Sequence, residues 1–447
     1  MTPEFSPRKA AYYTLGCKLN FAETSTIGKI LSERGFRRVM PGEEPDICVV
    51  NTCSVTEMAD KKGRSLVRRL TRRWPGATMV VTGCYAQLKP SEVASIEGVD
   101  IVLGSNEKLL ISEFLDRWEH DHTPIVESTS PTEITMFRPS CERGDRTRYW
   151  LKVQDGCDYY CTYCTIPFAR GRSRSGLTSD LVEQARRAAA DGGKEIVITG
   201  VNIGEFGKDT GESLLDLLKA LDAVSGIERY RISSIEPNLL TEDIIRWVAE
   251  ESRAFMPHFH IPLQSGSDAV LRLMNRRYDT SLFASRIAMI KDLIPDAFIG
   301  VDVIAGARGE TEEELRRSMD FIEGLPVTRL HVFPYSERPG TAALLMNAPL
   351  AEISERHRRA ALIQQISDAK LSDFFRRMEG SERPVLWEHM VHDEEDNAPA
   401  EPLMSGLTDN YLRIVAPARP ELLNAVSRVR IGRQHPTLEE TLMGEHI

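Results

Sequence analysis

The stretch Cys157-Asp158-Tyr159-Tyr160-Cys161-Thr162-Tyr163-Cys164 places three cysteines within eight residues, at the spacing C-x3-C-x2-C, and we call these cysteines the loop triplet. Neither a helix nor a strand presents these positions to one point, so the three thiols meet only where the backbone forms a loop. The flanking residues agree, because Tyr149 to Val153 is typical of a strand and Asp155-Gly156 of a turn. The sequence therefore predicts a strand followed by a loop that wraps one metal centre.

This cysteine loop has three interpretations. Buried core cysteines are disfavoured because the surrounding residues are polar and turn-forming. A zinc site needs a fourth Cys or His, and no His occurs between His122 and His258, so zinc would take a distant ligand. A 4Fe-4S cluster on three thiolates leaves one iron open to a substrate. We favour the cluster, because the spacing and the aromatic Tyr163 before the third cysteine resemble the signature of radical S-adenosylmethionine (SAM) enzymes.

Three further cysteines, Cys17, Cys53 and Cys84, each follow an apolar, strand-like run at intervals of about one βα unit, and we call them the strand triplet. The carboxyl ends of parallel strands lie at one edge of a sheet, so these thiols are expected to meet in space. In a reducing compartment such thiols are more often ligands than disulfides. Of the eight cysteines, Cys48 remains as a buried small hydrophobe and Cys141 has no expected role.

The composition of the 447 residues is that of a folded protein, with 41% hydrophobic and 27% charged residues. No run approaches the roughly 18 to 20 apolar residues of a membrane span, and Met1 to Ala10 lacks the apolar core of a secretory signal. We therefore expect a cytoplasmic protein without a membrane partner. The net charge of -10 argues against nucleic-acid binding by the whole surface and leaves that role to local basic patches.

Hydrophobic periodicity divides the chain into an α/β protein of several domains. Residues 1–119 alternate strands and helices, which predicts a doubly wound α/β domain, and residues 120–140 are expected to form a polar linker. Residues 141–380 contain six further strand candidates separated by helices, which predicts a partial (βα)6 barrel with its active site at the strand carboxyl ends. Residues 381–447 contain short β runs and predict a small β-barrel.

Motifs spread along the chain resemble those of the methylthiotransferase family of radical SAM enzymes, in the same domain order. These motifs are Thr14-Leu15-Gly16-Cys17-Lys18-Leu19-Asn20, Asn51-Thr52-Cys53-Ser54-Val55-Thr56, Gly83-Cys84-Tyr85-Ala86-Gln87, His260-Ile261-Pro262-Leu263-Gln264-Ser265-Gly266-Ser267 and Tyr335-Ser336-Glu337-Arg338-Pro339-Gly340-Thr341. The C-terminal segment resembles a TRAM domain, a module that docks RNA or protein. The resemblance covers nearly the whole chain.

Within that family, Cys17-Lys18-Leu19-Asn20 and residues 83–87 are most similar to the MtaB branch, whose members act on N6-threonylcarbamoyladenosine at position 37 of tRNA. The isopentenyladenosine branch usually has Gln-Met after the first cysteine, and the ribosomal-protein branch has Pro-Lys. One stretch departs from the family pattern. The family's Gly-Phe-Pro-Gly-Glu-Thr is here Gly306-Ala307-Arg308-Gly309-Glu310-Thr311, so the usual contacts of Phe-Pro are missing.

The resemblance implies an enzyme that puts a methylthio group on C2 of N6-threonylcarbamoyladenosine in tRNA, with two 4Fe-4S clusters and two SAM molecules per turnover. The loop triplet would hold the catalytic cluster, at which reductive cleavage of SAM gives a 5′-deoxyadenosyl radical. The strand triplet would hold a second cluster that carries the added sulfide, and a second SAM would methylate that sulfur. The implied partners are the modified tRNA, an electron donor and a sulfur donor.

The resemblance also suggests residues that bind SAM. Tyr163 would lie beside the SAM adenine, by family analogy. Gly200 and Asn202, after the strand candidate Glu195 to Thr199, would face the same cavity, Gly200 by allowing close backbone approach and Asn202 as a polar group. Gln264, at another strand end, is a similar candidate. Each assignment competes with a purely structural role, as a space-filling aromatic side chain or a turn residue.

Local basic clusters are the candidates for tRNA contact. Arg170, Arg172 and Arg174 follow the cysteine loop and are preferred because they adjoin the expected active site. A second cluster, on the helix predicted over Thr56 to Arg73, consists of Lys61, Lys62, Arg64, Arg68, Arg69, Arg72 and Arg73. The arginines of the C-terminal segment are outnumbered by acids, including Asp393-Glu394-Glu395-Asp396.

Two alternative functions compete with this one. The first is methylthiolation of another target, either isopentenyladenosine in tRNA or a ribosomal-protein aspartate. The second is a non-catalytic, metal-bearing RNA-binding protein, for which zinc without labile sulfide would be the chemical signature.

Overall fold

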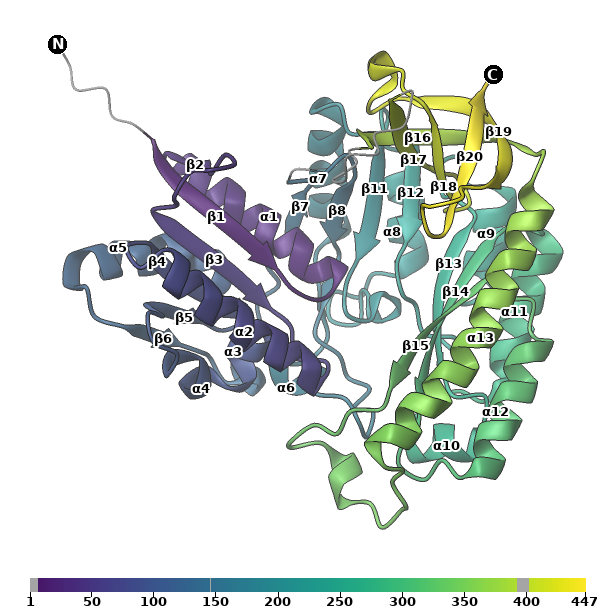
Figure 1. The fold of residues 1–447 in the computed structure, drawn as a ribbon, viewed down its shortest axis with the longest axis horizontal. Helices are drawn as coiled ribbons and strands as arrows, with labels where there is room; N and C mark the ends of the chain where they lie inside the picture. The colour runs from purple at the N-terminus through teal and green to yellow at the C-terminus, as the bar shows by residue number, and fades with distance from the viewer. Residues whose placement is uncertain (1–6, 145, 392–401) are drawn as a thin grey trace.

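The computed structural model describes residues 7–144, 146–391 and 402–447, and three parts follow one another along the chain (Figure 1). The N-terminal α/β part and the central part lie side by side, and the C-terminal β-barrel lies at one end of the central part. The acidic run Asp393 to Asp396 lies outside the described residues, as does most of the stretch Met1 to Ala10. In the described ranges, no helix combines the length and the apolarity that a bilayer crossing requires.

A six-stranded parallel sheet in the order β2-β1-β3-β4-β5-β6 forms the N-terminal part. Its strands are β1 (Arg8–Thr14), β2 (Phe36–Arg38), β3 (Ile47–Thr52), β4 (Thr78–Gly83), β5 (Ile101–Leu103) and β6 (Ile125–Glu127). The helices are α1 (Lys18–Glu33), α2 (Glu57–Arg73), α3 (Cys84–Leu88), α4 (Pro90–Ala94) and α5 (Ile111–Asp121), with the 3-10 turn η1 (Lys108–Leu110). Separate buried clusters form around Val50 and Val81 on one face and around Val49 and Val80 on the other, so the sheet is doubly wound, as predicted.

The sheet extends past the boundary predicted at residue 119. β6 pairs in parallel with β5, inside the predicted linker 120–140. A strand of three residues carries no readable periodicity, and here Ile125 is buried while Val126 is 45% exposed. The polar segment that follows contains the 3-10 turn η2 (Pro131–Glu133).

Six parallel strands form the central partial barrel. They are β8 (Tyr149–Lys152), β11 (Glu195–Thr199), β12 (Arg229–Ile232), β13 (His258–Gln264), β14 (Phe298–Ala305) and β15 (Arg329–Pro334). They belong to the sheets β12-β11-β8-β7 and β13-β14-β15, where β7 (Ser140–Glu142) is an antiparallel edge strand. Parallel bridges between Tyr230 and Phe255 and between Ser234 and His260 join the two sheets. The predicted radical SAM-type barrel is therefore confirmed as an open one.

Helices pack on the outside of this barrel against a large buried apolar cluster. They are α7 (Thr178–Ala190), α8 (Leu214–Asp222), α9 (Glu242–Glu250), α11 (Thr280–Leu293), α12 (Glu312–Gly324) and α13 (Ile353–Met378). The short helix α6 (Ile166–Arg170) packs against α3, and α10 (Asp268–Leu273) contributes to a separate small cluster. The side chains of Thr241, Ser267, Asp279 and Thr311 accept a backbone N–H at the starts of α9 to α12, which fixes where these helices begin. The remaining short elements are β9 (Gln154–Asp155), β10 (Arg174–Ser175), η3 (Ile203–Glu205) and η4 (Ala342–Leu345).

A closed five-stranded barrel ends the chain, in the order β16-β17-β18-β20-β19. Its elements are β16 (Glu382–Met390), β17 (Leu403–Thr408), β18 (Arg413–Pro417), η5 (Pro420–Leu422), β19 (Val426–Gln434) and β20 (Thr441–His446). Its core around Trp387 is continuous with Phe374 of α13 and Phe298 of β14. Arg229 and Arg231 donate hydrogen bonds from β12 to backbone carbonyl oxygens at the end of β17. The predicted small β-barrel is confirmed, and it is fixed to the amino-terminal ends of the central strands.

Candidate active site between the three parts

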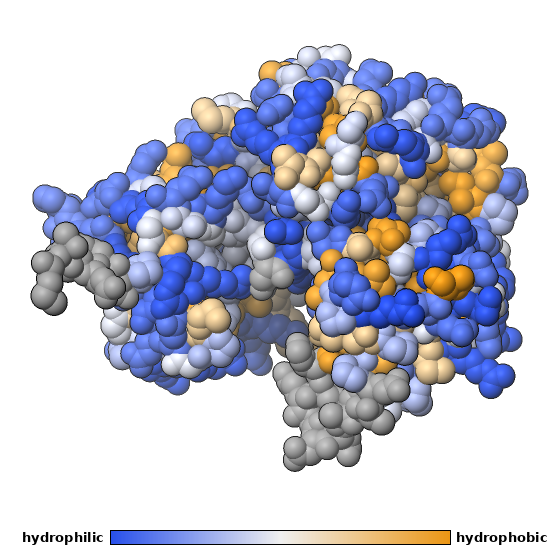
Figure 2. Space-filling model, turned by 90° about the horizontal axis from the view of Figure 1, so that it is seen from above, coloured by the Kyte–Doolittle hydropathy of each residue, from blue (hydrophilic) through white to orange (hydrophobic). Residues whose placement is uncertain are grey.

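A cavity of about 1030 Å³ lies where the three parts meet. Its walls include Cys17, Cys53 and Cys84 from the N-terminal part, Gly200 and Val201 after β11, His260, Asp302 and His331 from the barrel strands, and Tyr411 and Arg413 from the C-terminal barrel. A space of this size accommodates a ligand as large as a nucleoside. Seen from above, the N-terminal part is covered mainly by hydrophilic side chains, while apolar ones gather in separate small groups on the other side of the molecule (Figure 2).

The strand triplet lies on one wall of this cavity. Cys17 precedes α1, Cys53 follows β3, and Cys84 begins α3 at the end of β4. The approach of Cys53 depends on Gly16, whose φ is +99° and whose Cβ, if it had one, would lie 2.8 Å from the Cys53 Sγ. The topology of a parallel sheet thus brings together three thiols that are far apart in the sequence.

The donor set of the strand triplet fits an iron–sulfur cluster, because all three candidate ligands are thiols. Burial raises the pKa of Cys53 to about 12, and the neighbouring Cys84 adds to this, so the thiol must lose a proton when it binds metal. Within the part of the chain that the structure describes, no three His, Cys, Asp or Glu side chains are grouped to hold a single metal ion. Each thiolate of a cluster binds a different iron, so the thiols that hold a cluster lie farther apart than those that hold one zinc ion. The spacing of the described thiols therefore does not correspond to a preformed zinc site.

The loop triplet follows β9 and lies next to the cavity without lining it. The Ile166 N–H donates to the Cys164 Sγ at 3.4 Å, and Ile166 is itself part of the cavity wall. Burial and the neighbouring Cys161 raise the pKa of Cys164 to about 12. The three thiols thus form a second soft donor set beside the same cavity, which fits a second cluster.

Arg276 is a candidate functional residue that the sequence analysis does not identify. Its Nη1 donates to the Cys161 Sγ at 3.0 Å, and the buried guanidinium forms an ion pair with Glu236. A cation held against a ligand sulfur offsets the negative charge that a bound cluster brings. Its position in Asn275-Arg276-Arg277-Tyr278, directly after α10, gave no signal by itself, because only the fold brings it to the loop triplet.

The four predicted SAM-binding residues lie in different surroundings. Gly200 lines the cavity, and a Cβ there would lie 2.9 Å from the Gln154 carbonyl oxygen, so only glycine fits. Asn202 is 4% exposed, and neither polar atom of its side chain has a partner within the described residues, which fits a site for a polar ligand. Gln264 has a φ of +67° at an irregularity of β13, and Tyr163 packs into an apolar cluster. Of the four, only Gly200 belongs to the cavity lining.

Two of the three arginines expected to contact RNA are buried, which corrects that prediction. Arg170 is 1% exposed and forms ion pairs at 3.0 Å with both Glu23 and Asp155. Arg174 is 5% exposed and forms an ion pair with Asp155 at 3.1 Å. Their charges are neutralised by Asp155 and, for Arg170, also by the distant Glu23, so they are not available to phosphates. Arg172 is exposed.

Glu23 of α1 is the centre of a buried ion network between the N-terminal and central parts. It is fully buried and forms ion pairs with Lys108, Lys152 and Arg170. Burial raises the pKa of this carboxyl, but Arg170, Lys108 and Lys152 outweigh the effect and hold the pKa well below its usual range. The network joins the helix that follows Cys17 to the strand and loop that carry the loop triplet.

Three polar side chains of the barrel strands face the cavity, and the sequence analysis does not identify their role. Nε2 of His260 lies 2.8 Å from Oδ1 of Asp302, and the rings of His260 and His331 are 5.1 Å apart. Burial and the neighbouring His260 lower the pKa of His331 to about 4, so this ring is neutral at physiological pH. The alternation of side chains along these strands could have identified the three residues, because residues of the opposite face, such as Ile261 and Val301, belong to the apolar core.

The second basic cluster of the sequence lies on α2. Six of its seven cations are exposed: Lys61, Lys62, Arg68, Arg69, Arg72 and Arg73. Arg64 instead pairs with Glu92 at 2.9 Å. α2 begins four residues after Cys53, and its exposed cations follow from Lys61 to Arg73 along the helix as it leads away from the cavity wall.

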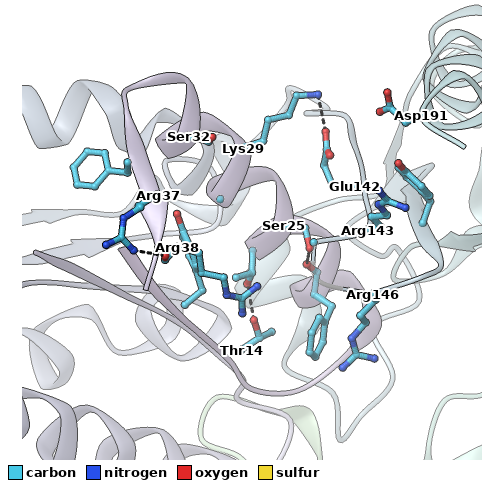
Figure 3. Close-up of a pocket in the computed structure, with 17 residues that line it drawn as sticks. Thr14, Ser25, Lys29, Ser32, Arg37, Arg38, Glu142, Arg143, Arg146 and Asp191 are labelled. Carbon is cyan, nitrogen blue, oxygen red and sulfur yellow. Dashed lines mark hydrogen bonds and ion pairs between the residues drawn. The ribbon is translucent and has the colours of Figure 1, made fainter. Parts of the chain in front are cut away.

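A second cavity, of about 830 Å³, lies along the outer side of α1 (Figure 3). Arg143 and Arg146 approach it from the segment before β8, and Lys29 of α1 pairs there with Glu142 at 2.8 Å. Its lining contains no cysteine and none of the predicted SAM-binding residues. It is therefore separate from the candidate active site.

Comparison with known proteins agrees with this arrangement. Residues 9–104 match an uncharacterized protein family, UPF0004, and residues 151–322 match the Radical SAM superfamily. The chain is 36% identical over 427 residues to the threonylcarbamoyladenosine tRNA methylthiotransferase MtaB of Bacillus subtilis, covering 94% of this chain and 93% of the relative. The chain belongs to the methylthiotransferase family of radical SAM enzymes. As a member of that superfamily, this methylthiotransferase uses SAM and a 4Fe-4S cluster.

Two further proteins are similar to this methylthiotransferase, one in sequence and one in fold. It is 30% identical over 384 residues to the tRNA-2-methylthio-N(6)-dimethylallyladenosine synthase of Syntrophus aciditrophicus, covering 84% of this chain and 82% of the relative. Among solved structures, the radical SAM methyltransferase TsrM of Kitasatospora setae, with tryptophan and a SAM analogue bound, has a TM-score of 0.54 at 13% identity and covers 74% of each chain. That similarity concerns the fold alone.

Proposed function

We propose that this methylthiotransferase acts on tRNA and converts N6-threonylcarbamoyladenosine at position 37 to its 2-methylthio derivative. The observation that carries the proposal is that two separate cysteine triplets, one from each of two parts of the chain, meet at one cavity of nucleoside size. The strand triplet lines this cavity, and the loop triplet lies beside it, next to Ile166 of the cavity wall. The choice of adenosine rests on similarity, since identity is 36% to the relative named for threonylcarbamoyladenosine and 30% to the one named for dimethylallyladenosine.

The proposal assigns one 4Fe-4S cluster to the loop triplet and a second to the strand triplet, with two SAM molecules per turnover. When bound, these groups supply radical chemistry at the unactivated C2–H bond and the methylthio group that replaces the hydrogen. The chain's own residues do the rest. Arg276 holds a positive charge against Cys161, Gly200 lets SAM approach the backbone, and Asn202 offers the SAM its two unpartnered polar atoms. Tyr163 and Gln264 stay predicted SAM contacts.

For tRNA, the exposed face of α2 is the proposed phosphate-binding surface in place of Arg170 and Arg174. Its exposed cations follow one another along a helix whose first turn lies near Cys53. An RNA strand bound along this face would therefore lead toward the strand triplet. Arg172 stays a predicted contact. The C-terminal barrel, proposed as a TRAM-like domain, closes the cavity with Tyr411 and Arg413.

The proposal divides the chain into a methylthiotransferase domain that extends through β6, a central radical SAM domain over residues 141–380, and a TRAM-like domain over residues 381–447. It also requires an electron donor and a sulfur donor, and it places the enzyme in the cytoplasm with its tRNA. The alternative targets, isopentenyladenosine and a ribosomal-protein aspartate, share all of these requirements except the substrate.

Nucleoside analysis of tRNA from a deletion strain tests the target. Loss of the 2-methylthio form with accumulation of N6-threonylcarbamoyladenosine is the expected result, and restoration by the wild-type gene but not by a Cys157→Ala gene ties it to the site. Unchanged 2-methylthio-threonylcarbamoyladenosine in the deletion strain would contradict the proposal. Loss of the methylthio group from dimethylallyladenosine or from the ribosomal protein would indicate an alternative target.

Anaerobic counting of iron and sulfide in the purified protein tests the metal content. Two 4Fe-4S clusters per chain are expected for the wild type. One cluster is expected after either Cys157→Ala or Cys53→Ala, and only the second variant should still cleave SAM. Zinc without labile sulfide would support the non-catalytic RNA-binding alternative instead.

A further inference from the structure

The cavity is lined by five cations that differ in whether a carboxylate neutralises them. They are Lys18, Arg148, Arg170, Arg329 and Arg413. Three of these form ion pairs: Arg148 with Glu388, Arg170 with Glu23 and Asp155, and Arg329 with Glu440. Within the described residues, Lys18 and Arg413 form no ion pair with a carboxylate. These two cations therefore line the cavity without direct contact to a carboxylate of the described residues.

Lys18 is the first residue of α1 and directly follows Cys17. Its Nζ lies 6.0 Å from the ring centroid of Tyr411, on the far side of the cavity in the C-terminal barrel. The Tyr411 ring is held in place by stacking on His258, with ring centroids 4.2 Å apart. The half-buried ammonium of Lys18 thus points across the cavity, between the strand triplet and the C-terminal barrel.

Among the residues that the structure describes, no carboxylate of the cavity contacts the Lys18 ammonium directly. Oδ1 of Asp302 is engaged by His260, and Lys18 contributes to the lowered pKa of Asp302 without forming an ion pair with it. Glu440 is engaged by Arg329, and Glu439 forms no ion pair with Lys18. The ring of His331 is neutral at physiological pH. An ammonium in a partly closed cavity without a carboxylate partner is unfavourable unless a ligand supplies the negative charge.

We propose that Lys18, with Arg413 at the mouth of the cavity, forms a subsite for a carboxylate on the N6 substituent of the substrate adenosine. The proposal rests on the proposed function, because the threonylcarbamoyl group carries such a carboxylate next to a hydroxyl and a ureido group. A charge-assisted hydrogen bond from the ammonium to this carboxylate is short and strong. A dimethylallyl group has no polar atom and would leave the ammonium buried without a partner, so the same subsite rejects it.

Equilibrium binding of anticodon stem-loop RNAs to the reconstituted full-length protein tests this subsite. The RNAs carry N6-threonylcarbamoyladenosine, its methyl ester or dimethylallyladenosine. The wild type should bind the free acid about tenfold or more tightly than the ester. In Lys18→Met the preference for the acid should fall several-fold, because the ammonium is removed and Arg413 alone remains to attract the carboxylate. Lys18→Arg should retain the preference for the acid.

Lys29→Met is the matched control, since Lys29 lies on the same helix but pairs with Glu142 outside the cavity. It should keep the wild-type preference. Iron and sulfide content and SAM cleavage without RNA should be the same in all four proteins, which shows that Lys18→Met has not disturbed the neighbouring Cys17. Equal affinity of the wild type for acid and ester, or an unchanged preference in Lys18→Met, would overturn the proposal.

These outcomes separate the subsite from the function. Methylthiolation of N6-threonylcarbamoyladenosine by a protein without acid-over-ester preference would reject the subsite and leave the function standing. An acid-over-ester preference that depends on Lys18, in a protein that methylthiolates no adenosine, would reject the function and retain the subsite.

Discussion

Glu23 is the single residue on which the connection between the two cysteine triplets most depends. It is fully buried among Lys108, Lys152 and Arg170, so Glu23→Gln would leave buried cations with one carboxylate fewer. Breaking a buried ion pair in this way typically costs about 3–5 kcal/mol. We expect Glu23→Gln to lower the free energy of unfolding by about that amount, measured by urea denaturation at neutral pH.

The matched control is Glu33→Gln, because Glu33 is an exposed glutamate of the same helix. It should change the free energy of unfolding by about 0.5 kcal/mol or less. A loss in Glu23→Gln no larger than that in Glu33→Gln would contradict the role of the network.

The same network makes stability depend on pH. The pKa of Glu23 is held well below that of a free glutamate by Arg170, Lys108 and Lys152, against the opposing effect of burial. A carboxyl whose pKa is lower in the folded state stabilises the protein above the pKa of the unfolded state and loses that contribution as the pH falls toward the folded value. Denaturation curves between about pH 5 and about pH 2 should therefore show a steeper loss of stability for the wild type than for Glu23→Gln, because this range lies between the unfolded and the folded pKa of the carboxyl.

At this scale the positions of the cysteines were predictable from the sequence, and the burial of Arg170 and Arg174 was not. A thiol at the end of each strand is a local pattern, and the parallel topology then determines where it lies. The burial of Arg170 and Arg174 depends instead on Glu23, which is far away in the sequence, and on Asp155. No local pattern reveals that a basic side chain is neutralised by a distant carboxylate, as Arg276 is by Glu236. The position of Lys18 in the cavity likewise depends on the fold.

At the scale of a secondary structure element, the exposed cations of helix α2 are expected to bind tRNA phosphates. Replacing Arg68, Arg69 and Arg72 by Gln removes three exposed cations from it without touching its buried residues Val67 and Leu70. Removing one cation that neutralises a phosphate lowers the dependence of log Kd on log salt concentration by about 0.7 to 0.9. We expect weaker tRNA binding and a slope smaller by about 2 to 3 across a KCl titration.

The control for this variant is Arg186→Gln with Arg187→Gln on α7, where the cations are equally exposed but pair with Glu183. It should leave the affinity and the salt slope unchanged. If both variants change the slope equally, the basic face of α2 has no special role in RNA binding.

The alternation of strands and helices was readable from the sequence wherever the elements were long. The three-residue strands β2, β6 and β7 were not predicted, because so few residues carry little periodicity, and β17 and β20 were absent from the predicted strands of the C-terminal barrel. The class of each part was still correct, since it depends on the order of the long elements.

At the scale of the whole molecule, the candidate active site requires the N-terminal and central parts to keep their relative position. Arg338, in the segment after β15, donates from Nη2 to Asp60 Oδ2 at 2.6 Å and to Ser54 Oγ at 2.8 Å, next to Cys53. This contact is buried and joins parts that are far apart in the sequence. Truncating one partner of such a pair costs about 2–5 kcal/mol. We expect Arg338→Met to loosen the two parts, so that the radius of gyration in solution scattering increases.

In Arg338→Met, SAM cleavage should become uncoupled from methylthiolation, so that more 5′-deoxyadenosine is formed per methylthiolated nucleoside. The loop triplet should keep its iron and sulfide. Arg317→Met, an exposed arginine of α12 paired with Glu313, is the control and should behave as the wild type. An unchanged ratio of 5′-deoxyadenosine to methylthiolated nucleoside in Arg338→Met would show that this contact does not fix the relative position of the two triplets.

The relative placement of the three parts was the least predictable feature of the molecule. It arises from buried pairs such as Arg338 with Asp60 and from the hydrogen bonds of Arg229 and Arg231 to the C-terminal barrel. Each involves residues that look like ordinary surface charges in the sequence. The cavity exists only because these contacts bring the three parts together.

Anaerobic turnover of the reconstituted enzyme with SAM, reductant, sulfide and tRNA bearing N6-threonylcarbamoyladenosine, followed by mass analysis of the nucleosides, tests the proposed function. The expected product is 2-methylthio-N6-threonylcarbamoyladenosine, formed by the wild type and by neither Cys157→Ala nor Cys53→Ala. Product formed by Cys53→Ala, or 5′-deoxyadenosine formed by the wild type without any methylthiolated nucleoside, would contradict a reaction that needs both cysteine triplets at one cavity.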